Sequence, residues 1–205
     1  MKKNKSSKSW IIKQHRDPFY KKSKVLGYRS RSAFKLIEIN NKFKFIKKSS
    51  LVLDLGASPG GWSQVVSKIV KNGKIVAIDI KDFEKINNVH FIKGDFKKEI
   101  NDEKIIDIFK NKINIVLSDM AANTTGNSNL DSIRTNLLCQ EAILFSKNVL
   151  QKNGVFVSKV FMGSEFLELK KLAKEIFVKV IFFKPKSSRN ESKETFMYCD
   201  TLKAL

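Results

Sequence analysis

The sequence predicts an α/β protein built on a doubly wound, mostly parallel sheet of seven strands. Short apolar segments alternate along the chain with segments whose apolar residues recur at helical spacing. Most of the short segments lack a polar face, which is typical of strands that helices cover on both sides. A length of 205 residues with 42% hydrophobic residues suits one such domain, and the chain has no internal repeat.

The first elements follow from the spacing of apolar residues. A helix begins near Ser30, and residues 51–55 form the first strand. A glycine turn then leads into a helix whose apolar face consists of Trp62, Val65, Val66, Ile69 and Val70. Ser58 and Pro59 stand where the N-cap and the first residue of this helix are expected, and Asn72-Gly73 ends it.

The alternation continues to the end of the chain. We expect further strands at residues 74–79, 89–92, 113–118, 155–159, 178–183 and 194–201. Helices near residues 103–110, 137–149 and 164–176 lie between them. The turn Lys152-Asn153-Gly154 closes the second of these helices, and Ser164 caps the third. The polar loop 186–193 joins the last two strands without a helix, so the last strand should enter the sheet antiparallel.

Positive charge is concentrated at the N-terminus. The whole chain has a formal net charge of +20, and residues 1–35 contain twelve Lys or Arg against one acid, Asp17. Four aromatic residues are interleaved with the basic ones: Trp10, Phe19, Tyr20 and Tyr28. A solvated tail that aids solubility is one interpretation, but this mixture also suits phosphate contacts and base stacking. We therefore expect residues 1–29 to form a basic, partly flexible RNA-binding arm.

Several classes of protein do not fit this sequence. No segment approaches the roughly 18 consecutive apolar residues of a membrane span, and the N-terminus lacks the apolar core of a signal peptide. Cys139 and Cys199 lie in apolar stretches and are expected to be buried thiols in a reducing cytosol. His15 and His90 are too few for a histidine-based metal centre, and we expect no metal site. We expect a cytoplasmic monomer without membrane contact.

Acidic residues lie at or just after the ends of the first four predicted strands: Asp54, Asp79, Asp95 and Asp119. Because ligands of such sheets bind beyond the carboxyl ends of the strands, these side chains should gather at one binding edge. The glycine turn at residues 54–62 matches neither the dinucleotide fingerprint nor the P-loop. Asp79 is placed to bind a ribose diol, which NAD and S-adenosylmethionine share. Carboxylates repel a pyrophosphate and attract a sulfonium, which favours S-adenosylmethionine over the cofactor of an NAD-dependent oxidoreductase.

Six segments together resemble the FtsJ (RrmJ) family of ribosomal RNA 2′-O-methyltransferases, and the resemblance extends from about Ser9 to Lys203. The segments are residues 27–36, 54–64, 94–96, 118–121, 158–161 and 184–189. Ser-Asp-Met-Ala at 118–121 and the region around Trp10 are most similar to bacterial members that modify large-subunit ribosomal RNA. The resemblance implies a Rossmann-like class I methyltransferase domain, here residues 30–205, with S-adenosylmethionine as methyl donor.

The resemblance also implies a catalytic Lys-Asp-Lys-Glu tetrad, which maps onto Lys35, Asp119, Lys159 and Glu194. A ribose 2′-hydroxyl must attack the methyl group in line, and it is a poor nucleophile until its proton is removed or tightly held. Lys159 is expected nearest to this hydroxyl, either as a base or as the donor that orients its lone pair. Asp119 would position Lys159, while Lys35 and Glu194 steady the ribose.

For the donor, the resemblance implies that Gly60 and Trp62 line the methionine side. Asp79 would contact the ribose and Asp95 the adenine, and Asp119 would help to hold the methionine part. Trp62 also falls on the apolar face of its helix, so a pure packing role is an equally good interpretation.

The expected acceptor is a uridine of large-subunit (23S) ribosomal RNA, in the assembled 50S particle. Two alternatives stay open: a transfer RNA 2′-O-methyltransferase of the same family, and a non-catalytic RNA-binding factor for ribosome assembly. All four tetrad residues are present, which disfavours the second alternative. The polar loop 123–129, directly after Asp119, is either a lid over the donor or a mobile connector, and its position favours contact with RNA or donor.

Overall fold

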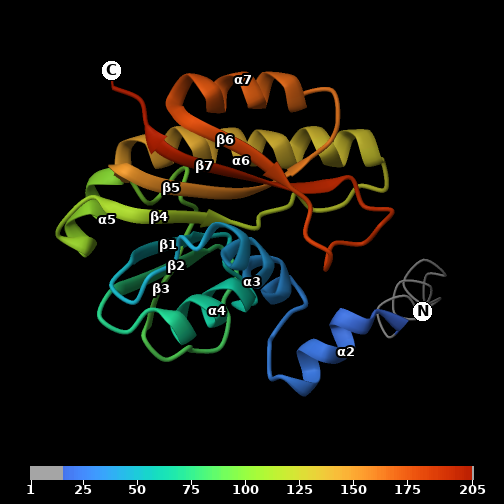
Figure 1. Cartoon of the computed structure of the whole chain (residues 1–205), viewed down its shortest axis with the longest axis horizontal. Coiled ribbons are helices and arrows are strands. Elements are labelled where there is room, and N and C mark those ends of the chain that lie inside the picture. The colour runs from blue at the N-terminus through green and yellow to red at the C-terminus, as the bar shows by residue number, and fades with distance from the viewer. Residues whose placement is uncertain (1–15, 205) are drawn as a thin grey trace.

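The computed structural model describes residues 16–204, and within them the chain forms a seven-stranded sheet with helices on both faces (Figure 1). The elements follow in the order α2 (Pro18–Val25), α3 (Ser32–Phe43), β1 (Leu51–Leu55), α4 (Gly61–Ile69), β2 (Lys74–Asp79), β3 (Val89–Lys93), α5 (Asp102–Phe109), β4 (Ile113–Ser118), α6 (Ser128–Val149), β5 (Leu150–Phe161), α7 (Phe166–Ile176), β6 (Phe177–Phe183) and β7 (Glu194–Leu202). The strand order in the sheet is β3-β2-β1-β4-β5-β7-β6. The chain thus builds one half outward from β1 to β3 and then returns to build the other half from β4.

The strand pairing confirms the predicted fold class. All pairs among β3, β2, β1, β4 and β5 are parallel, and β7 pairs antiparallel with both β5 and β6. Because β7 runs against β5, its first residue, Glu194, lies opposite Phe161 at the end of β5. The start of β7 therefore shares an edge with the carboxyl ends of the parallel strands.

Two apolar cores fill the space between the sheet and its helices. One core joins the sheet to α5, α6 and α7, through residues such as Ile105 and Ala142. The other joins it to α3 and α4, through residues such as Leu36 and Val66. The two cysteines are free and buried, as predicted. In the part of the chain that the structure describes, no helix combines the length and apolarity that crossing a membrane requires.

The helix after the glycine turn begins later than predicted. α4 starts at Gly61 with Gly60 as its N-cap, so the prediction of Ser58 and Pro59 as N-cap and first residue was wrong. Gly60 has a φ of 99°, a left-handed conformation that interrupts any helical path before it. The N–H of Ser58 instead donates to the Asp79 carboxylate over 2.8 Å. The glycine turn is therefore bound to the end of β2, where it helps to shape the site.

Three predicted boundaries in the second half of the chain are also wrong. α6 begins at Ser128 rather than near residue 137, because the side chain of Asn127 caps it. The predicted turn at 152–154 belongs to β5, which starts directly after α6 at Leu150 and is accommodated by a register shift against β4. Ser164 does not cap α7, since its hydroxyl bonds to a neighbouring carboxylate and the N-cap position makes no side-chain bond.

Part of the predicted N-terminal arm is helical. The Asp17 carboxylate caps α2 by accepting two N–H groups of its first turn. Phe19 and Tyr28 each contact the ring of Phe34 in α3, with ring centroids 5.6 Å apart in both pairs. Two of the four interleaved aromatic residues therefore pack against the domain. Residues 1–15 lie outside the described residues, and the RNA-binding role of the arm stays a prediction.

Candidate active site

Two lysine–carboxylate pairs meet at the carboxyl edge of the sheet. Lys159, near the end of β5, donates to the backbone oxygen of Asp119 over 2.8 Å and to its Oδ1 over 3.1 Å. Lys35 of α3 lies 2.8 Å from each carboxylate oxygen of Glu194, the first residue of β7. Residues from four distant parts of the sequence thus come together as two pairs. The geometry joins the members of the predicted tetrad, and their catalytic roles stay predictions.

The alternation of strand side chains explains why a lysine from β5 reaches this edge. Val155 and Val157 point into the core beneath α3 and α4, and Lys159 continues the same face of the strand. On the neighbouring strand β7, Phe196 lies opposite Lys159. The ring of Phe196 also lies 5.6 Å from Nζ of Lys35. The apolar ring of Phe196 therefore lies next to both lysines.

The two pairs form one electrostatic unit. Lys35, Lys159 and Glu194 are each only 8% exposed. Burial disfavours the charged form of Glu194, but the charge and hydrogen bond of Lys35 together with the charge of Lys159 outweigh it, and the pKa of Glu194 is lowered. Glu194 therefore stays ionised at neutral pH and is influenced by both lysines.

A cavity of about 480 Å³ adjoins the tetrad at the ends of β1, β2, β3 and β4. Its lining includes Gly56, Ser58, Asp79, Gly94, Asp95, Phe96, Asp119, Met120, Asn123 and Leu138. The volume is within the range of roughly 300–1,000 Å³ that is usual for sites of small molecules. Asp119 both lines the cavity and binds Lys159, so one end of a ligand held here would lie beside the Lys159 ammonium.

Backbone N–H groups fix the carboxylates in the cavity wall. Asp79 accepts the N–H of Ser58 over 2.8 Å and that of Lys81 over 2.7 Å, one on each oxygen. Asp95 accepts the N–H of Lys97 over 2.9 Å. An ionised carboxylate has about four acceptor positions, so each retains capacity for a hydroxyl or amino group of a ligand. Such a wall suits a nucleoside with a free ribose diol.

The apolar part of the cavity was missed by the sequence reasoning. Phe96, Met120 and Leu138 line it and provide a surface for a flat, apolar ring. Gly56 has a φ of +69°, and a Cβ there would lie 2.1 Å from Cγ of Met120, so only glycine fits. Phe96 and Met120 each follow a strand-end aspartate directly, and this adjacency could have revealed them.

Two predicted donor-binding residues lie outside this lining. Trp62 is 2% exposed, donates through Nε1 to the backbone oxygen of Ser32 over 3.0 Å and packs near the ring of Phe196. These contacts match the packing interpretation of Trp62. A Cβ on Gly60 would lie 2.8 Å from Cδ1 of Ile86 and 3.0 Å from Nη1 of Arg29, so the glycine makes room for both side chains. The contact of both residues with the methionine side of a donor stays a prediction.

The first residue of the loop 123–129 lines the cavity. Asn123 is among the lining residues, and its backbone oxygen accepts a bond from Arg134 over 3.1 Å. Thr125 donates through both its N–H and its hydroxyl to Asp131, over 2.8 Å each. The first half of the loop is therefore tied to α6 beside the cavity. Its contact with RNA or donor stays a prediction.

Asp54 is buried and is not part of the cavity lining. The residue is 1% exposed, and its Oδ2 accepts the hydroxyl of Ser63 over 2.6 Å. The structure therefore brings three of the four strand-end acids to the cavity and buries the fourth. Burial raises the pKa of Asp54 to about 7 against the opposing hydrogen bond of Ser63, and the charges of Asp119 and Asp79 raise it further.

We expect Asp54 to lower the free energy of unfolding as the pH rises from about 4 to about 7. The unfolded carboxyl ionises near pH 4, about three units below the folded one, so the native state binds the extra proton in this interval. Urea unfolding of the parent and of Asp54→Asn, at about pH 5 and about pH 8, measures the effect. The parent should lose more stability than the variant between the two conditions. Equal losses would contradict the assignment.

Comparison with known proteins gives consistent matches. A family model described as FtsJ-like methyltransferase matches residues 28–202. The chain is 54% identical to the ribosomal RNA large subunit methyltransferase E of Pelagibacter ubique over 203 residues, which cover 99% of this chain and 100% of that protein. It is 45% identical to the protein of the same name from Rickettsia akari, with 94% and 87% covered. A crystal structure described as a ribosomal RNA methyltransferase from Plasmodium falciparum is similar with a TM-score of 0.73 and 36% identity, covering 85% of this chain and 98% of that one.

Proposed function

Because the chain belongs to the FtsJ-like methyltransferase family, we propose that it transfers a methyl group from S-adenosylmethionine to the 2′-hydroxyl of a uridine in large-subunit (23S) ribosomal RNA. The observation that carries the proposal is the position of Asp119, which lines the cavity and holds Lys159 at its end. The names of the two bacterial relatives support the choice of acceptor. We further propose that the enzyme acts as a monomer, in the cytoplasm, on the assembled 50S particle.

The cavity fits the donor by chemistry as well as by size. The Asp79 carboxylate would accept the ribose diol, and Asp95 would accept the amino group of the adenine beside the apolar wall. When bound, S-adenosylmethionine supplies an electrophilic methyl group on a positively charged sulfur. Carboxylates around the cavity favour this charge, and the chain would reject a cofactor with a pyrophosphate for the same reason.

Lys159 would prepare the acceptor hydroxyl. Its ammonium has three donor positions, and among residues 16–204 the contacts with Asp119 use two of them. The remaining position can orient the lone pair of a ribose hydroxyl, or remove its proton once Lys159 is neutral. Lys35 and Glu194, held together 2.8 Å apart, would fix the ribose on the other side. Lys35, Lys159 and Glu194 are each only 8% exposed, which would limit the access of water to a hydroxyl held between them.

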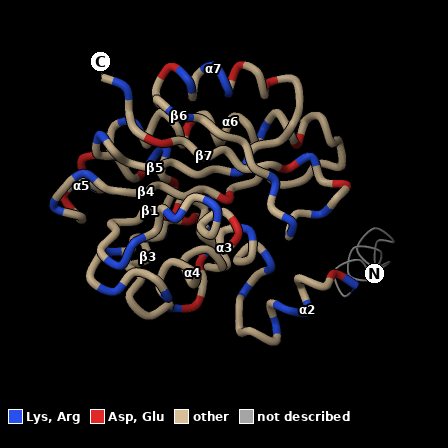
Figure 2. Tube along the Cα trace, viewed as in Figure 1, with Lys and Arg blue, Asp and Glu red and all other residues tan. Residues whose placement is uncertain are grey.

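Basic residues occur on two segments that lead to the tetrad. They recur along α2 and in the loop between β6 and β7, on the side of the molecule where the described chain begins (Figure 2). We propose that residues 1–29 act as an RNA-binding arm next to the methyltransferase domain of residues 30–205. Phosphates of a structured RNA would then be held close to the tetrad by several lysines and arginines at once.

Transfer of labelled methyl to three acceptors, with the modified ribose mapped, tests the proposal. The acceptors are undermethylated large ribosomal subunits, free large-subunit RNA and transfer RNA. Label on a uridine ribose of the subunits supports the proposal in full, and label on free ribosomal RNA alone removes the assembled particle from it. Label in transfer RNA alone would move the enzyme to another acceptor class. Donor binding without transfer to any acceptor would favour a non-catalytic assembly factor.

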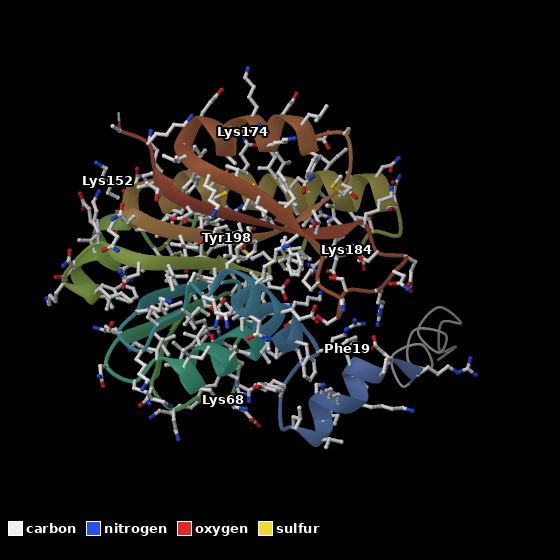
Figure 3. All side chains as sticks on the ribbon, in the orientation of Figure 1. Phe19, Lys68, Lys152, Lys174, Lys184 and Tyr198 are labelled. Atoms are coloured by element: carbon white, nitrogen blue, oxygen red, sulfur yellow. The ribbon has the colours of Figure 1, made fainter. Side chains whose placement is uncertain are left out.

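The proposed RNA-binding arm leads to a separate prediction about the salt dependence of RNA binding. Replacement of Lys2, Lys3, Lys5 and Lys8 by glutamine should weaken RNA binding and flatten its dependence on salt concentration, because fewer counterions are released. Donor affinity should not change. The matched control replaces four exposed lysines, Lys171, Lys174, Lys179 and Lys203. Lys174 projects from α7 on the opposite side of the view from Phe19 of α2 (Figure 3). Equal salt slopes in the parent and in both variants would make the arm a solvated tail.

A further inference from the structure

Asp17 makes contacts that the capping of a helix does not require. Its Oδ1 accepts the N–H groups of Phe19 and Tyr20 and thereby caps α2. Its Oδ2 accepts a bond from Nη1 of Arg31 and another from Nε of Arg189, the latter over 3.3 Å. The side chain is 6% exposed, so this carboxylate is buried between two guanidinium groups. A cap for an exposed eight-residue helix would need neither arginine.

The two arginines belong to the two segments that carry the pair Lys35–Glu194. Arg31 is the N-cap residue of α3, one turn before Lys35. Arg189 lies in the loop that leads into β7, five residues before Glu194. The Oδ2 atom of Asp17 is therefore a common partner of both segments, close to where each enters the active site.

Further contacts fasten the same loop to α3. The second guanidinium nitrogen of Arg31 donates to the backbone oxygen of Ser187. The Glu38 carboxylate accepts the N–H of Lys186 over 2.6 Å and that of Ser187 over 3.0 Å. The buried hydroxyl of Ser187 has no hydrogen-bond partner within residues 16–204. The loop is therefore held against α3 by charged groups and backbone bonds, and the serine hydroxyl adds nothing to this junction.

The Asp17 carboxylate compensates part of the positive charge of the two guanidinium groups at the junction. Burial lowers the pKa of the Arg31 guanidinium, Asp17 raises it and Arg189 lowers it further. Without the Asp17 charge, two partly buried guanidinium groups would face each other with reduced compensation, and the loop would move away from α3 to separate them.

We propose that Asp17 is a positioning residue for methyl transfer, because its carboxylate joins Arg31 to Arg189 and thereby sets the geometry of Lys35 and Glu194. This inference rests on the proposed function of the tetrad. Asp17 itself is not among the lining residues of the cavity, so it would act through the tetrad.

The variant Asp17→Asn separates this role from simple capping. Asparagine caps helices as well as aspartate does, so α2 should stay folded, while the charge between the arginines is lost. The turnover number at saturating RNA and donor should fall by about tenfold or more, since small displacements of catalytic groups are costly. The dissociation constant of the donor should not change. Loss of a negative charge cannot weaken RNA binding electrostatically, so a lower turnover number would reflect positioning.

Hydrogen exchange gives a readout that does not depend on activity. The amides of Lys186 and Ser187 should exchange faster in Asp17→Asn, whereas those of the α2 helix keep their protection. Adding Arg189→Gln to Asp17→Asn should restore part of the turnover number and part of the amide protection, because it removes the repulsion between Arg189 and Arg31. The matched control is Asp107→Asn, which removes an exposed carboxylate that pairs with Lys110 over 3.0 Å.

The outcomes test the positioning role of Asp17 separately from the proposed methyl transfer. A turnover number for Asp17→Asn equal to that of Asp107→Asn, or unchanged exchange of the loop amides, would overturn the positioning role. An inactive parent would instead contradict the proposed function. In that case the exchange experiment still decides whether Asp17 holds the loop against α3.

Discussion

Lys159→Ala is expected to reduce methyl transfer by about a thousandfold or more, because a positioned proton acceptor or donor contributes roughly 10²–10⁴ to such reactions. The ammonium of Lys159 is bound by Asp119 at the end of the cavity, and alanine removes the group nearest to the acceptor hydroxyl. Donor affinity should remain close to that of the parent, since the Asp79 and Asp95 side of the cavity is untouched. Single-turnover transfer and a calorimetric titration with donor measure the two quantities.

Lys152→Ala is the matched control for this experiment, because Lys152 lies on the same strand β5 with an exposed side chain. It should transfer methyl groups at the parental rate. A Lys159→Ala enzyme that retains the parental rate would remove Lys159 from the mechanism. Lys159→Arg then distinguishes the two proposed roles, since arginine can donate a hydrogen bond but does not lose its proton near neutral pH. Activity in the arginine variant would favour orientation of the hydroxyl over removal of its proton.

The sheet was predictable because each strand carries its own signal. The apolar runs that became β1, β2 and β4 are bounded by polar or glycine residues, and burial on both faces left little ambiguity. Boundaries set by a single capping side chain were less predictable. The long helix α6 extends to Ser128 only because Asn127 caps it, while its first turns are mostly polar and give no apolar periodicity.

Other differences arise from contacts between distant segments. Apolar periodicity does not indicate α2, because its apolar face is weak, and the start signal Asp17-Pro18 was missed. The contacts of Asp17 with Arg31 and Arg189 come from distant segments. The bulge that carries 152–154 into β5 depends on the register against β4. Local spacing alone cannot specify such features, because their partners lie far away in the chain.

In the candidate site, too, local patterns predicted some residues, and contacts between distant segments determined the others. Strand-end positions identified Asp79, Asp95 and Asp119 as cavity residues, since parallel strands bring their carboxyl ends together. The same reasoning failed for Asp54, because it lies within β1 and not beyond its end, and its side chain points into the core toward Ser63. The pairing of Lys35 with Glu194 required knowledge of which helix covers the edge, and spacing in the sequence does not supply it.

Asp79→Ala is expected to weaken donor binding by about tenfold to hundredfold, while the rate at saturating donor stays near the parental value. The magnitude is that of a lost charge-assisted contact with two hydroxyl groups, about 1.5–3 kcal/mol. The carboxylate also fixes the N–H groups of Ser58 and Lys81, so the loop over the ribose would lose order. Because neither contact changes between the ground state and the transition state, the effect should appear in KM for the donor and not in kcat.

Asp82→Ala is the matched control for Asp79→Ala, because Asp82 stands three residues further along, is 67% exposed and pairs only with Lys93 among the salt bridges of residues 16–204. Titration with S-adenosylmethionine should give the parental dissociation constant for Asp82→Ala and a weaker one for Asp79→Ala. The variant Asp79→Asn, which keeps an acceptor for one N–H group, should fall between them if the ribose contact depends on charge. Equal donor affinity in the parent and in both Asp79 variants would remove Asp79 from the donor site and leave it as the residue that orders the glycine turn.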